Sequence, residues 1–355
     1  MSLSSVLAAL RRHQAPLEGP RWLHRALTAM VLVVAVLLPM YSAPYVNFDL
    51  TMVLVFAIGG LGLNLLTGYN GQVSLGHSAF VALGAYTAAV LIHNGWHYLI
   101  VLPISIAVCF AFGYLVGRPA LRLQGLQLAL VTLGLAIITP AAIERMGSVT
   151  EGQEGINVFS VTAPSWSGLA QDQWVYYLTL AGLVVGWVVA KRLTSGRIGR
   201  SLVAVRDNET VSRTLGIHAA RTKTVVFALS GAYAGAAGVF YVYVVQFVGP
   251  DSFGLTMAIA FLSLIVIGGI GTLPGAIFGA FFVRYVPSVT EQINPSASGF
   301  VYGAALVIVM FVMPRGIVGL VRAALRPAME RIPGRRASDP TNRKEAHELA
   351  VSFRG

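Results

Sequence analysis

The sequence predicts an all-α polytopic membrane protein with about ten transmembrane helices, within a range of about eight to ten. Three observations predict this fold class: the composition, a series of apolar runs of spanning length, and a one-sided distribution of basic residues. Of the 355 residues, 56% are hydrophobic and 11% are charged, whereas about a quarter of a soluble domain is charged. The mean hydropathy of +0.72 therefore excludes a water-soluble enzyme and a disordered chain.

Ten apolar runs approach the length that a membrane-spanning helix needs, about 20 residues. They are bounded by polar or charged residues and cover 26–46, 50–66, 79–94, 98–117, 126–143, 174–190, 223–245, 256–271, 274–290 and 299–313. Several runs are short or rich in glycine, and glycines and Pro274 separate the eighth run from the ninth. One of these two is open to interpretation as a broken or re-entrant helix, which leaves the number of crossings open by about one or two.

Lysine and arginine residues gather in alternate connections between these runs. If the first helix starts in the cytoplasm, the cytoplasmic segments and the flanking Lys223 contain 23 of the 25 basic residues. These segments are 1–25, 67–78, 118–125, 191–222 and 314–355. Because cytoplasmic connections of membrane proteins carry such an excess, both termini are predicted to be cytoplasmic.

The predicted domain organisation is one transmembrane domain, residues 26–320, between two basic terminal segments. A basic N-terminal segment at 1–25 precedes it, and a basic tail at 321–355, which is expected to be mobile, follows it. The domain contains an outside loop at 144–172 and a longer cytoplasmic loop at 191–222. We expect the basic tail to be attracted to anionic membrane lipid and not to bind nucleic acid.

The sequence contains no recognisable energy source and no catalytic group. A phosphate-binding P-loop needs a Gly-Lys pair, and none of the three lysines follows a glycine. Ion-driven carriers need ionisable groups at membrane depth. Arg284 is the one charge clearly inside a run, and we expect it either to snorkel along its stem or to pair with a carboxylate such as Glu291. The single cysteine excludes a disulfide framework, and no metal site is predicted.

The long cytoplasmic loop predicts a short amphipathic helix outside the membrane. Apolar residues alternate with charged ones from Ser201 to Leu215, and Gly216 is expected to stop the helix. Such a helix can rest on lipid headgroups or dock on a protein partner. The acidic Asp207 and Glu209 at its centre disfavour anionic lipid and suit a protein.

A segment around 67–78 combines turn-forming glycines with neutral polar side chains near membrane depth. Irregular backbone at that depth is tolerated where it is buried in protein or lines a water-filled cavity. A neutral polar lining suits the passage of a zwitterion or an amide. The candidate translocation-path residues are Asn64, Asn70, Gln72, Ser74 and His77. The alternative is that the glycines let helices pack closely and that the polar groups are satisfied inside the bundle.

Four stretches carry a family resemblance: GLNLLTGYNGQVSLGHSAFVALGA at 62–85, TEGQEGI at 150–156, RIGRSLVAVRDNETVSRTLGI at 197–217 and GGIGTLPGA at 268–276. Together and in this order, they resemble motifs of the M-type permeases of branched-chain amino acid ABC transporters. The resemblance covers about residues 45–320. It implies an ABC importer permease bundle that spans the inner membrane of a bacterium several times.

The resemblance also implies a role for the cytoplasmic loop, since in that family this loop docks on the ATPase. Apolar contacts from Leu202, Val203 and Val205 are expected to supply the docking energy. The coupling segment is completed by Arg206, Asp207, Asn208, Glu209 and Gly216.

The implied partners are a paralogous second permease subunit, two ABC ATPase subunits and a periplasmic substrate-binding protein. No cofactor is expected on this chain, because ATP and Mg²⁺ belong to the ATPases. Branched-chain amino acids are the expected cargo, and urea, amides and other small solutes are the alternative within the family. The alternative from another class is a self-contained secondary transporter or channel, which the scarcity of membrane-depth charges disfavours.

Overall fold

Helices form nearly all of the secondary structure. The computed structural model describes residues 21–120, 123, 125–159, 161–165, 167–293, 298–312 and 316–320. The first 20 residues of the basic N-terminal segment and the basic tail at 321–355 lie outside the described residues. Residues 31–319 form one compact unit, and the contacts described below lie within it.

The helices of the described chain are α2 Arg21–Tyr41, α3 Pro44–Leu63, the π-helix η1 Asn64–Tyr69, α4 His77–His93, α5 Tyr98–Ala120, α6 Leu126–Arg145, α7 Gly147–Thr150, α8 Gln171–Thr194, α9 Gly196–Asp207, α10 Glu209–Thr214, α11 Ala219–Val245, the 3₁₀ helix η2 Pro250–Phe253, α12 Leu255–Gly268, α13 Leu273–Ile293 and α14 Ser298–Val312. Two short strands, β1 Ile156–Asn157 and β2 Phe247–Val248, complete the secondary structure.

Each of the ten apolar runs coincides with a helix. In the described part of the chain, seven helices are long and apolar enough to cross a membrane: Pro44–Tyr69, Tyr98–Pro119, Leu126–Arg145, Gln171–Thr194, Ala219–Val245, Pro250–Gly268 and Leu273–Glu291. Three further apolar helices are shorter, at Leu32–Tyr41, His77–His93 and Gly299–Val309. The chain is therefore a multi-pass membrane protein, and the number of about ten crossings stays a prediction.

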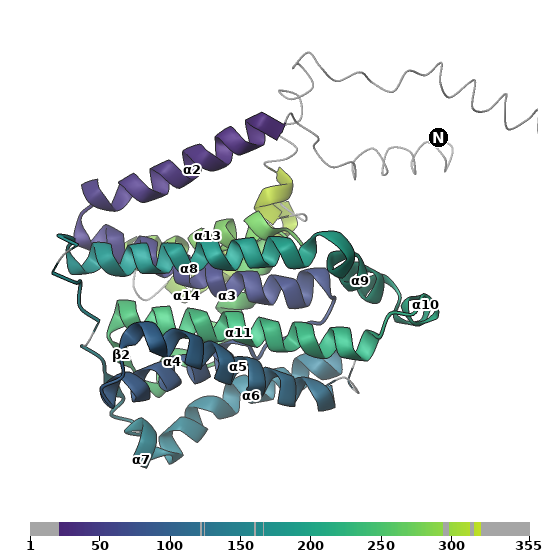
Figure 1. The fold of residues 1–355 in the computed structure, drawn as a ribbon, viewed down its shortest axis with the longest axis horizontal. Coiled ribbons are helices and arrows are strands. Elements are labelled where there is room, and N and C mark those ends of the chain that lie inside the picture. The colour runs from purple at the N-terminus through teal and green to yellow at the C-terminus, as the bar shows by residue number, and fades with distance from the viewer. Residues whose placement is uncertain are drawn as a thin grey trace, which may run out of the picture. The chain divides into compact units, whose positions relative to one another are not determined.

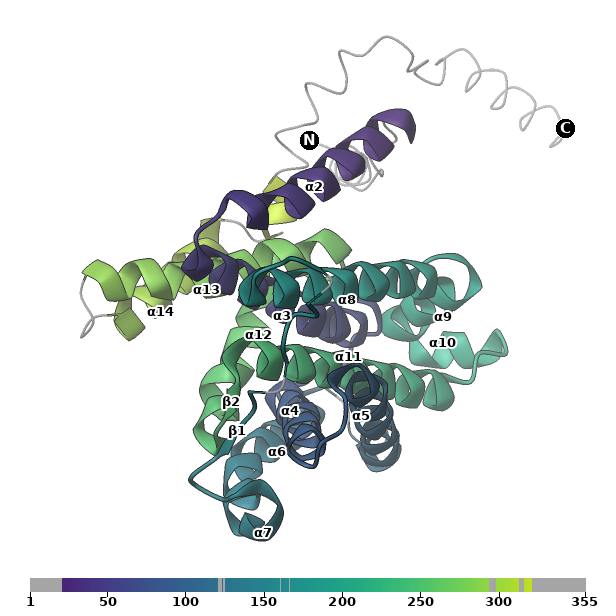
Figure 2. The same ribbon diagram turned by 60° about the vertical axis from the view of Figure 1, so that its left-hand side comes forward.

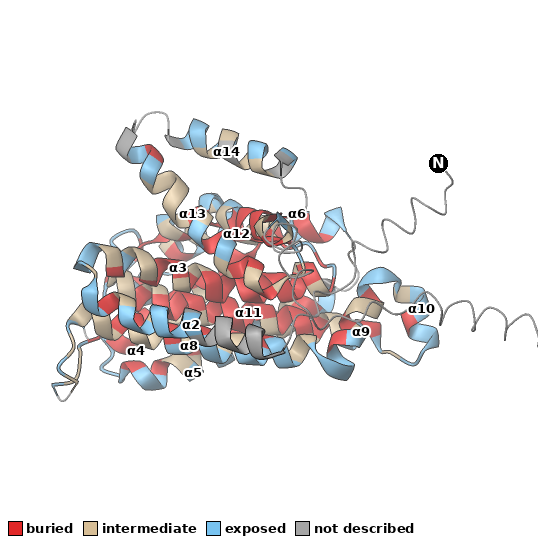
Figure 3. Cartoon of the chain, turned by 90° about the horizontal axis from the view of Figure 1, so that it is seen from above, coloured by how far each residue is buried: buried red, intermediate tan, exposed pale blue. Residues whose placement is uncertain are grey.

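Helix α11 lies at the centre of the bundle and packs against α3, α4 and α5 (Figure 1). Buried residues run along α3, α11 and α12 (Figure 3). In the most apolar part of α11, 72% of the residues are buried, against 22% in α5, so α5 presents an apolar face to lipid or to a partner. Small residues let α4 and α11 approach closely: a Cβ atom on Gly84 would lie 2.4 Å from the carbonyl oxygen of Gly235.

The connections between helices gather at two ends of this unit. Helices α9 and α10 lie at one end, and β1, β2 and α7 lie at the other (Figure 1, Figure 2). Two connections that the charge pattern assigns to the cytoplasm lie together at the first end, namely 67–78 and 191–222. Arg206 of the second connection donates a hydrogen bond to Gly68 of the first. The loop at 144–172 and the connection after α11, both predicted to lie outside, meet at the second end, where Ile156 pairs with Val248.

The outside loop differs from the all-α prediction in one detail. Within it, β1 pairs with β2 as an antiparallel ribbon, with Ile156 opposite Val248 and Asn157 opposite Phe247. Strands of two residues are too short to give an alternating hydrophobic pattern. The sequence therefore contains no signal for this ribbon, and only the helical patterns on either side of it were recognised.

Arg284 pairs with a carboxylate, as expected, but the carboxylate is that of Asp49 and not that of Glu291. Its guanidinium group, on α13, binds the carboxylate of Asp49 on α3, with the Nε atom 3.0 Å from Oδ1. Glu291 was the expected partner because it is seven residues away on the same chain segment. The helix α3 begins at Pro44, earlier than the apolar run suggested, and this extension brings Asp49 against α13.

Candidate functional site

The candidate site lies where the polar segment after α3 meets the loop between α12 and α13. Asn64 is fully buried at the start of η1 and uses both ends of its side-chain amide. Its Nδ2 atom donates to the carbonyl of Thr272 at 2.6 Å, and its Oδ1 atom accepts from the backbone N–H of Gly271 at 2.8 Å. Asn64 therefore joins two segments that are more than 200 residues apart in the sequence.

Glycine is required where these two segments touch. A Cβ atom on Gly68 would lie 2.5 Å from the backbone nitrogen of Gly271, closer than real Cβ atoms come to backbone. Gly271 itself has φ +75°, a left-handed conformation that suits glycine. We refer to η1 together with residues 269–272 as the η1 junction. This geometry favours the interpretation that the motif glycines allow close packing of backbone.

Three other candidate path residues are also engaged within the chain. Gln72 donates through Nε2 to the carbonyl of Lys223 at 3.2 Å, and the hydroxyl of Ser74 accepts from the N–H of Gly76 at 3.4 Å. The Nε2 atom of His77 donates to the carbonyl of Gly59 at 2.8 Å. These hydrogen bonds hold the segment in place.

Asn70 differs from these neighbours. It is 1% exposed, and within the described chain neither its Nδ2 nor its Oδ1 atom has a hydrogen-bond partner. An unsatisfied buried amide costs free energy, about 1–3 kcal/mol. Asn70 is therefore a candidate path residue whose side-chain amide has no hydrogen-bond partner within the described chain.

The loop at 191–222, which is predicted to be cytoplasmic, folds into two short helices, where one helix was expected. Helix α9 ends at Asp207, and Asn208 adopts an extended conformation with φ −159°. Its Oδ1 atom accepts from the N–H of Val211 at 3.0 Å and so caps α10. The predicted stop is confirmed, since α10 ends at Thr214 and Gly216 has φ +77°.

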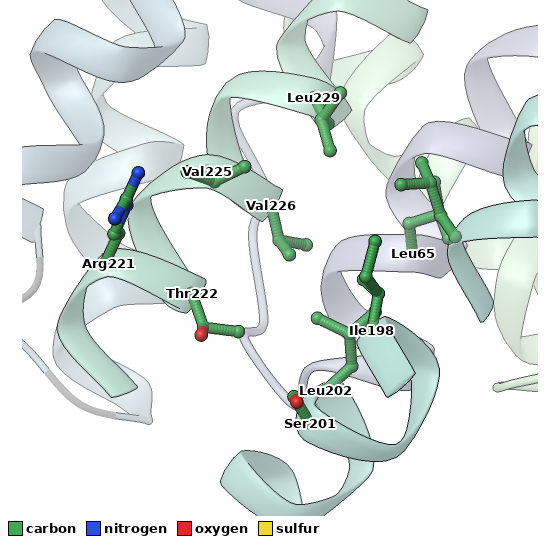
Figure 4. Close-up of a pocket in the computed structure, with 10 residues that line it drawn as sticks. Leu65, Ile198, Ser201, Leu202, Arg221, Thr222, Val225, Val226 and Leu229 are labelled. Atoms are coloured by element: carbon green, nitrogen blue, oxygen red, sulfur yellow. The ribbon is translucent and has the colours of Figure 1, made fainter. Parts of the chain in front are cut away.

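Helix α9 packs against the bundle through apolar residues that the sequence assigned to partner docking. Leu202 is 2% exposed and Val205 is 3% exposed, and Val203 is half-buried. Leu202 and Ile198 of α9 face Val226 of α11 across a pocket of about 460 Å³ (Figure 4). The further residues that line this pocket are Leu65, Leu193, Ser201, Arg221, Thr222, Val225 and Leu229.

The burial corrects one expectation about the docking contacts. Leu202 and Val205 attach α9 to its own chain, so a partner cannot reach these side chains while α9 is seated. The hydrophobic pattern of the loop indicates an apolar helix face. It does not reveal whether that face packs against a partner or against the same chain.

Helix α10 is tied to the start of α11 by an ionic cluster. The carboxylate of Glu209 binds the ammonium group of Lys223, and its Oε1 atom accepts from Arg213 at 2.7 Å. The hydrogen bond from Lys223, with a smaller contribution from Arg213, lowers the pKa of Glu209 below its usual value even though partial burial opposes this shift. The carboxylate of Glu209 is therefore used inside the chain, whereas Asp207 is largely exposed.

Arg206 links the two halves of the candidate site. Its Nη1 atom donates to the carbonyl of Gly68 at 3.0 Å, and its Nε atom donates to Asp207 at 3.0 Å. No sequence pattern indicated this contact, because 138 residues separate Arg206 from Gly68. The shared assignment of the two loops to one side of the membrane was the only available hint.

Several apolar side chains of the helix pair α9–α10 are left without cover. Ile198 is 55% exposed, Val211 52% and Leu215 70%. Among the described residues, no group of three or more His, Cys, Asp or Glu side chains could hold a metal ion. The features of this end of the protein are thus a buried polar junction and an anchored helix pair with exposed apolar residues.

Comparison with known proteins identifies the family. Residues 46–310 match the family model described as the branched-chain amino acid transport system permease component. The chain is 31% identical over 335 residues to the high-affinity branched-chain amino acid transport system permease protein LivM of Escherichia coli K12. The match covers 87% of this chain and 78% of LivM.

Two other relatives are more distant. The permease protein LivH of the high-affinity branched-chain amino acid transport system of Escherichia coli K12 is 23% identical, over 78% of this chain and 93% of its own length. The autoinducer 2 import system permease protein LsrC of Enterobacter sp. strain 638 is 28% identical, over 68% of this chain and 69% of its own length. The family match covers most of the membrane-embedded region described above, and the chain belongs to the family of permease components of branched-chain amino acid transport systems.

Proposed function

We propose that this chain is a permease subunit of an ATP-driven ABC importer and forms part of the translocation path for branched-chain amino acids or similar small polar solutes. The observation that carries the proposal is the helix pair α9–α10. It is anchored to the bundle by Leu202 and Glu209, and it leaves the apolar side chains of Val211 and Leu215 exposed. A permease that receives its energy from a separate ATPase needs such a fixed docking segment.

The proposed topology places both termini and α9–α10 in the cytoplasm of a bacterial inner membrane. The basic residues support this orientation, because 23 of 25 then lie on the cytoplasmic side or flank it. The grouping of connections at two ends is consistent with it, since 67–78 and 191–222 meet at one end. The outside loop 144–172 would then face the periplasm.

The proposed partners are a paralogous second permease, two ATPase subunits and a periplasmic substrate-binding protein. ATP and Mg²⁺ would bind to the ATPases, because no Gly-Lys pair exists in this chain. The names of LivM and LivH support a pair of permeases in one transport system. The name of LsrC, an autoinducer 2 permease, supports a broader range of small polar cargo in related proteins.

A self-contained secondary carrier is the rival. It needs a titratable or ion-binding group at membrane depth. The charged pair inside the helices, Arg284 with Asp49, is mutually satisfied. This pairing supports a structural role for both residues and disfavours an ion-coupling role.

The docking role is tested with two exposed residues and a matched control. The double variant Val211→Asp/Leu215→Asp should lose co-purification of the ATPase subunits, because charges would replace exposed apolar anchors. Phe159→Asp is the control, since Phe159 is 71% exposed in the outside loop. Normal ATPase binding by the double variant would contradict the docking role of α9–α10.

A further inference from the structure

The contact between α9 and η1 is built from both a hydrogen bond and close packing. Arg206 donates through Nη1 to the carbonyl of Gly68, and its Nε atom is held by Asp207. A Cβ atom at position 71 would lie 2.6 Å from Cγ of Arg206. The aliphatic part of the arginine therefore rests directly on the backbone of Gly71, which has φ +73°.

The position of Gly68 near the end of η1 explains why its carbonyl is available to the arginine. The last carbonyl groups of a helix have no partner within the helix. Gly68 precedes the final residue of η1, and its carbonyl accepts from the side chain of Arg206 instead. On its other side, Gly68 touches the backbone of Gly271, and Asn64 bonds to the same 269–272 turn.

We propose that Arg206 is a positioning residue that transmits movement of α9 to the η1 junction. The inference rests on the proposed function, because it assumes that the ATPases move α9. A displacement of α9 would pull or release the carbonyl of Gly68 and shift η1 against the 269–272 turn. The buried amide of Asn70, which directly follows η1, would then gain partners or solvent.

The structure gives this link a specific form. The acceptor at Gly68 is a neutral backbone carbonyl, so the link depends on geometry and not on pairing of two charges. The energy of α9 seating comes from Leu202 and Val205, which are separate from the link. Loss of the Arg206 contact should therefore impair transmission while α9 stays in place.

The main test compares two arginines of α9 in the reconstituted complete transporter. Arg206→Gln should lower the amount of solute taken up per ATP hydrolysed by at least about fivefold, the lower end of typical coupling between sites. Arg206→Lys, which keeps a cationic donor group at the end of a long side chain, should restore part of this ratio. Arg200→Gln is the control, because Arg200 is exposed on the same helix, and it should leave the ratio unchanged.

A second measurement separates transmission from docking. Hydrogen–deuterium exchange of the complete transporter should show an ATP-dependent change at residues 64–72 and 269–272. In Arg206→Gln this change should be lost, whereas the change at α9–α10 should persist. Loss of ATPase binding by Arg206→Gln would instead make Arg206 a docking residue and overturn the inference.

A double-mutant comparison tests the packing part of the link. Gly71→Ala should lower the uptake ratio because its Cβ displaces Arg206, and this loss should be smaller in the Arg206→Ala background. A wild-type uptake ratio in Arg206→Gln would refute the inference and leave the proposed function intact. If the unmodified complex showed no ATP-driven uptake, the proposed function itself would fail.

Discussion

Replacement of Asn64 by alanine tests how the η1 junction is held together. The variant removes an amide that is 0% exposed and that makes two hydrogen bonds to the 269–272 turn. The carbonyl of Thr272 loses its donor, and the N–H of Gly271 loses its acceptor. Both hydrogen bonds are partly buried, so water replaces the lost partners only in part.

The expected cost follows from these two contacts. A buried polar group left without its partner costs about 1–3 kcal/mol, so two groups cost about 2–6 kcal/mol. In a chain of this size, 1 kcal/mol changes the midpoint of thermal unfolding by about 2 °C. Asn64→Ala should therefore lower the Tm by about 4–12 °C.

The assay is thermal unfolding of the purified protein in detergent. Unfolding is measured as the loss of monodisperse protein with increasing temperature. Asn94→Ala is the control, because Asn94 is exposed and makes one bond to Val90 within its own helix. That control should change the stability by about 0.5 kcal/mol or less. Equal Tm values for Asn64→Ala and Asn94→Ala would refute the claim that Asn64 joins the two segments.

Three further outcomes are expected. A cysteine at Arg200→Cys should react with a membrane-impermeant thiol reagent in inside-out vesicles and not in intact cells; reaction in intact cells would reverse the orientation. The pairing of Glu209 with Lys223 stabilises the fold at neutral pH, because it lowers the pKa of Glu209. This contribution should decrease as the pH falls below the ordinary glutamate pKa of about 4.3, because the carboxylate then becomes protonated. The Tm difference between wild type and Glu209→Gln should therefore be largest at pH 7 and smaller at pH 4. A difference that does not change with pH would count against the pairing. Asp49→Ala should destabilise the protein by about 2 kcal/mol, which is less than the 3–5 kcal/mol of a fully buried pair because Asp49 and Arg284 are partly exposed. The charge-swapped variant Asp49→Arg/Arg284→Asp should recover part of the lost Tm. No recovery would show that the two residues do not act as a pair.

The sequence was sufficient to locate the helices of the bundle. Eight of the ten apolar runs had boundaries within about four residues of the helices, because the length of an apolar run is set by the bilayer. The first two runs began five to six residues after the start of α2 and α3. The loop around 67–78 was also predicted, since its glycines prevent a continuous helix. The π-helix that extends α3 to Tyr69 was not predicted, because a hydropathy pattern does not distinguish a π-helix from an α-helix or from the start of a loop.

Contacts between distant segments were not accessible from the sequence. Arg206 with Gly68 and Arg284 with Asp49 join residues 138 and 235 positions apart. The break at Asn208 had a visible signal, because asparagine followed by glutamate is typical of a helix N-terminus. The continuous apolar periodicity of the loop outweighed this signal and led to the expectation of a single helix.

The central claim is that ATP hydrolysed by separate subunits drives transport through this chain. The most direct test is uptake of a branched-chain amino acid into proteoliposomes that contain this chain, the second permease and the two ATPases, with the binding protein added outside. We expect accumulation of the amino acid against its gradient to require ATP and every subunit, and no accumulation with a proton or sodium gradient alone. Accumulation driven by an ion gradient in vesicles that contain only this chain would contradict the central claim.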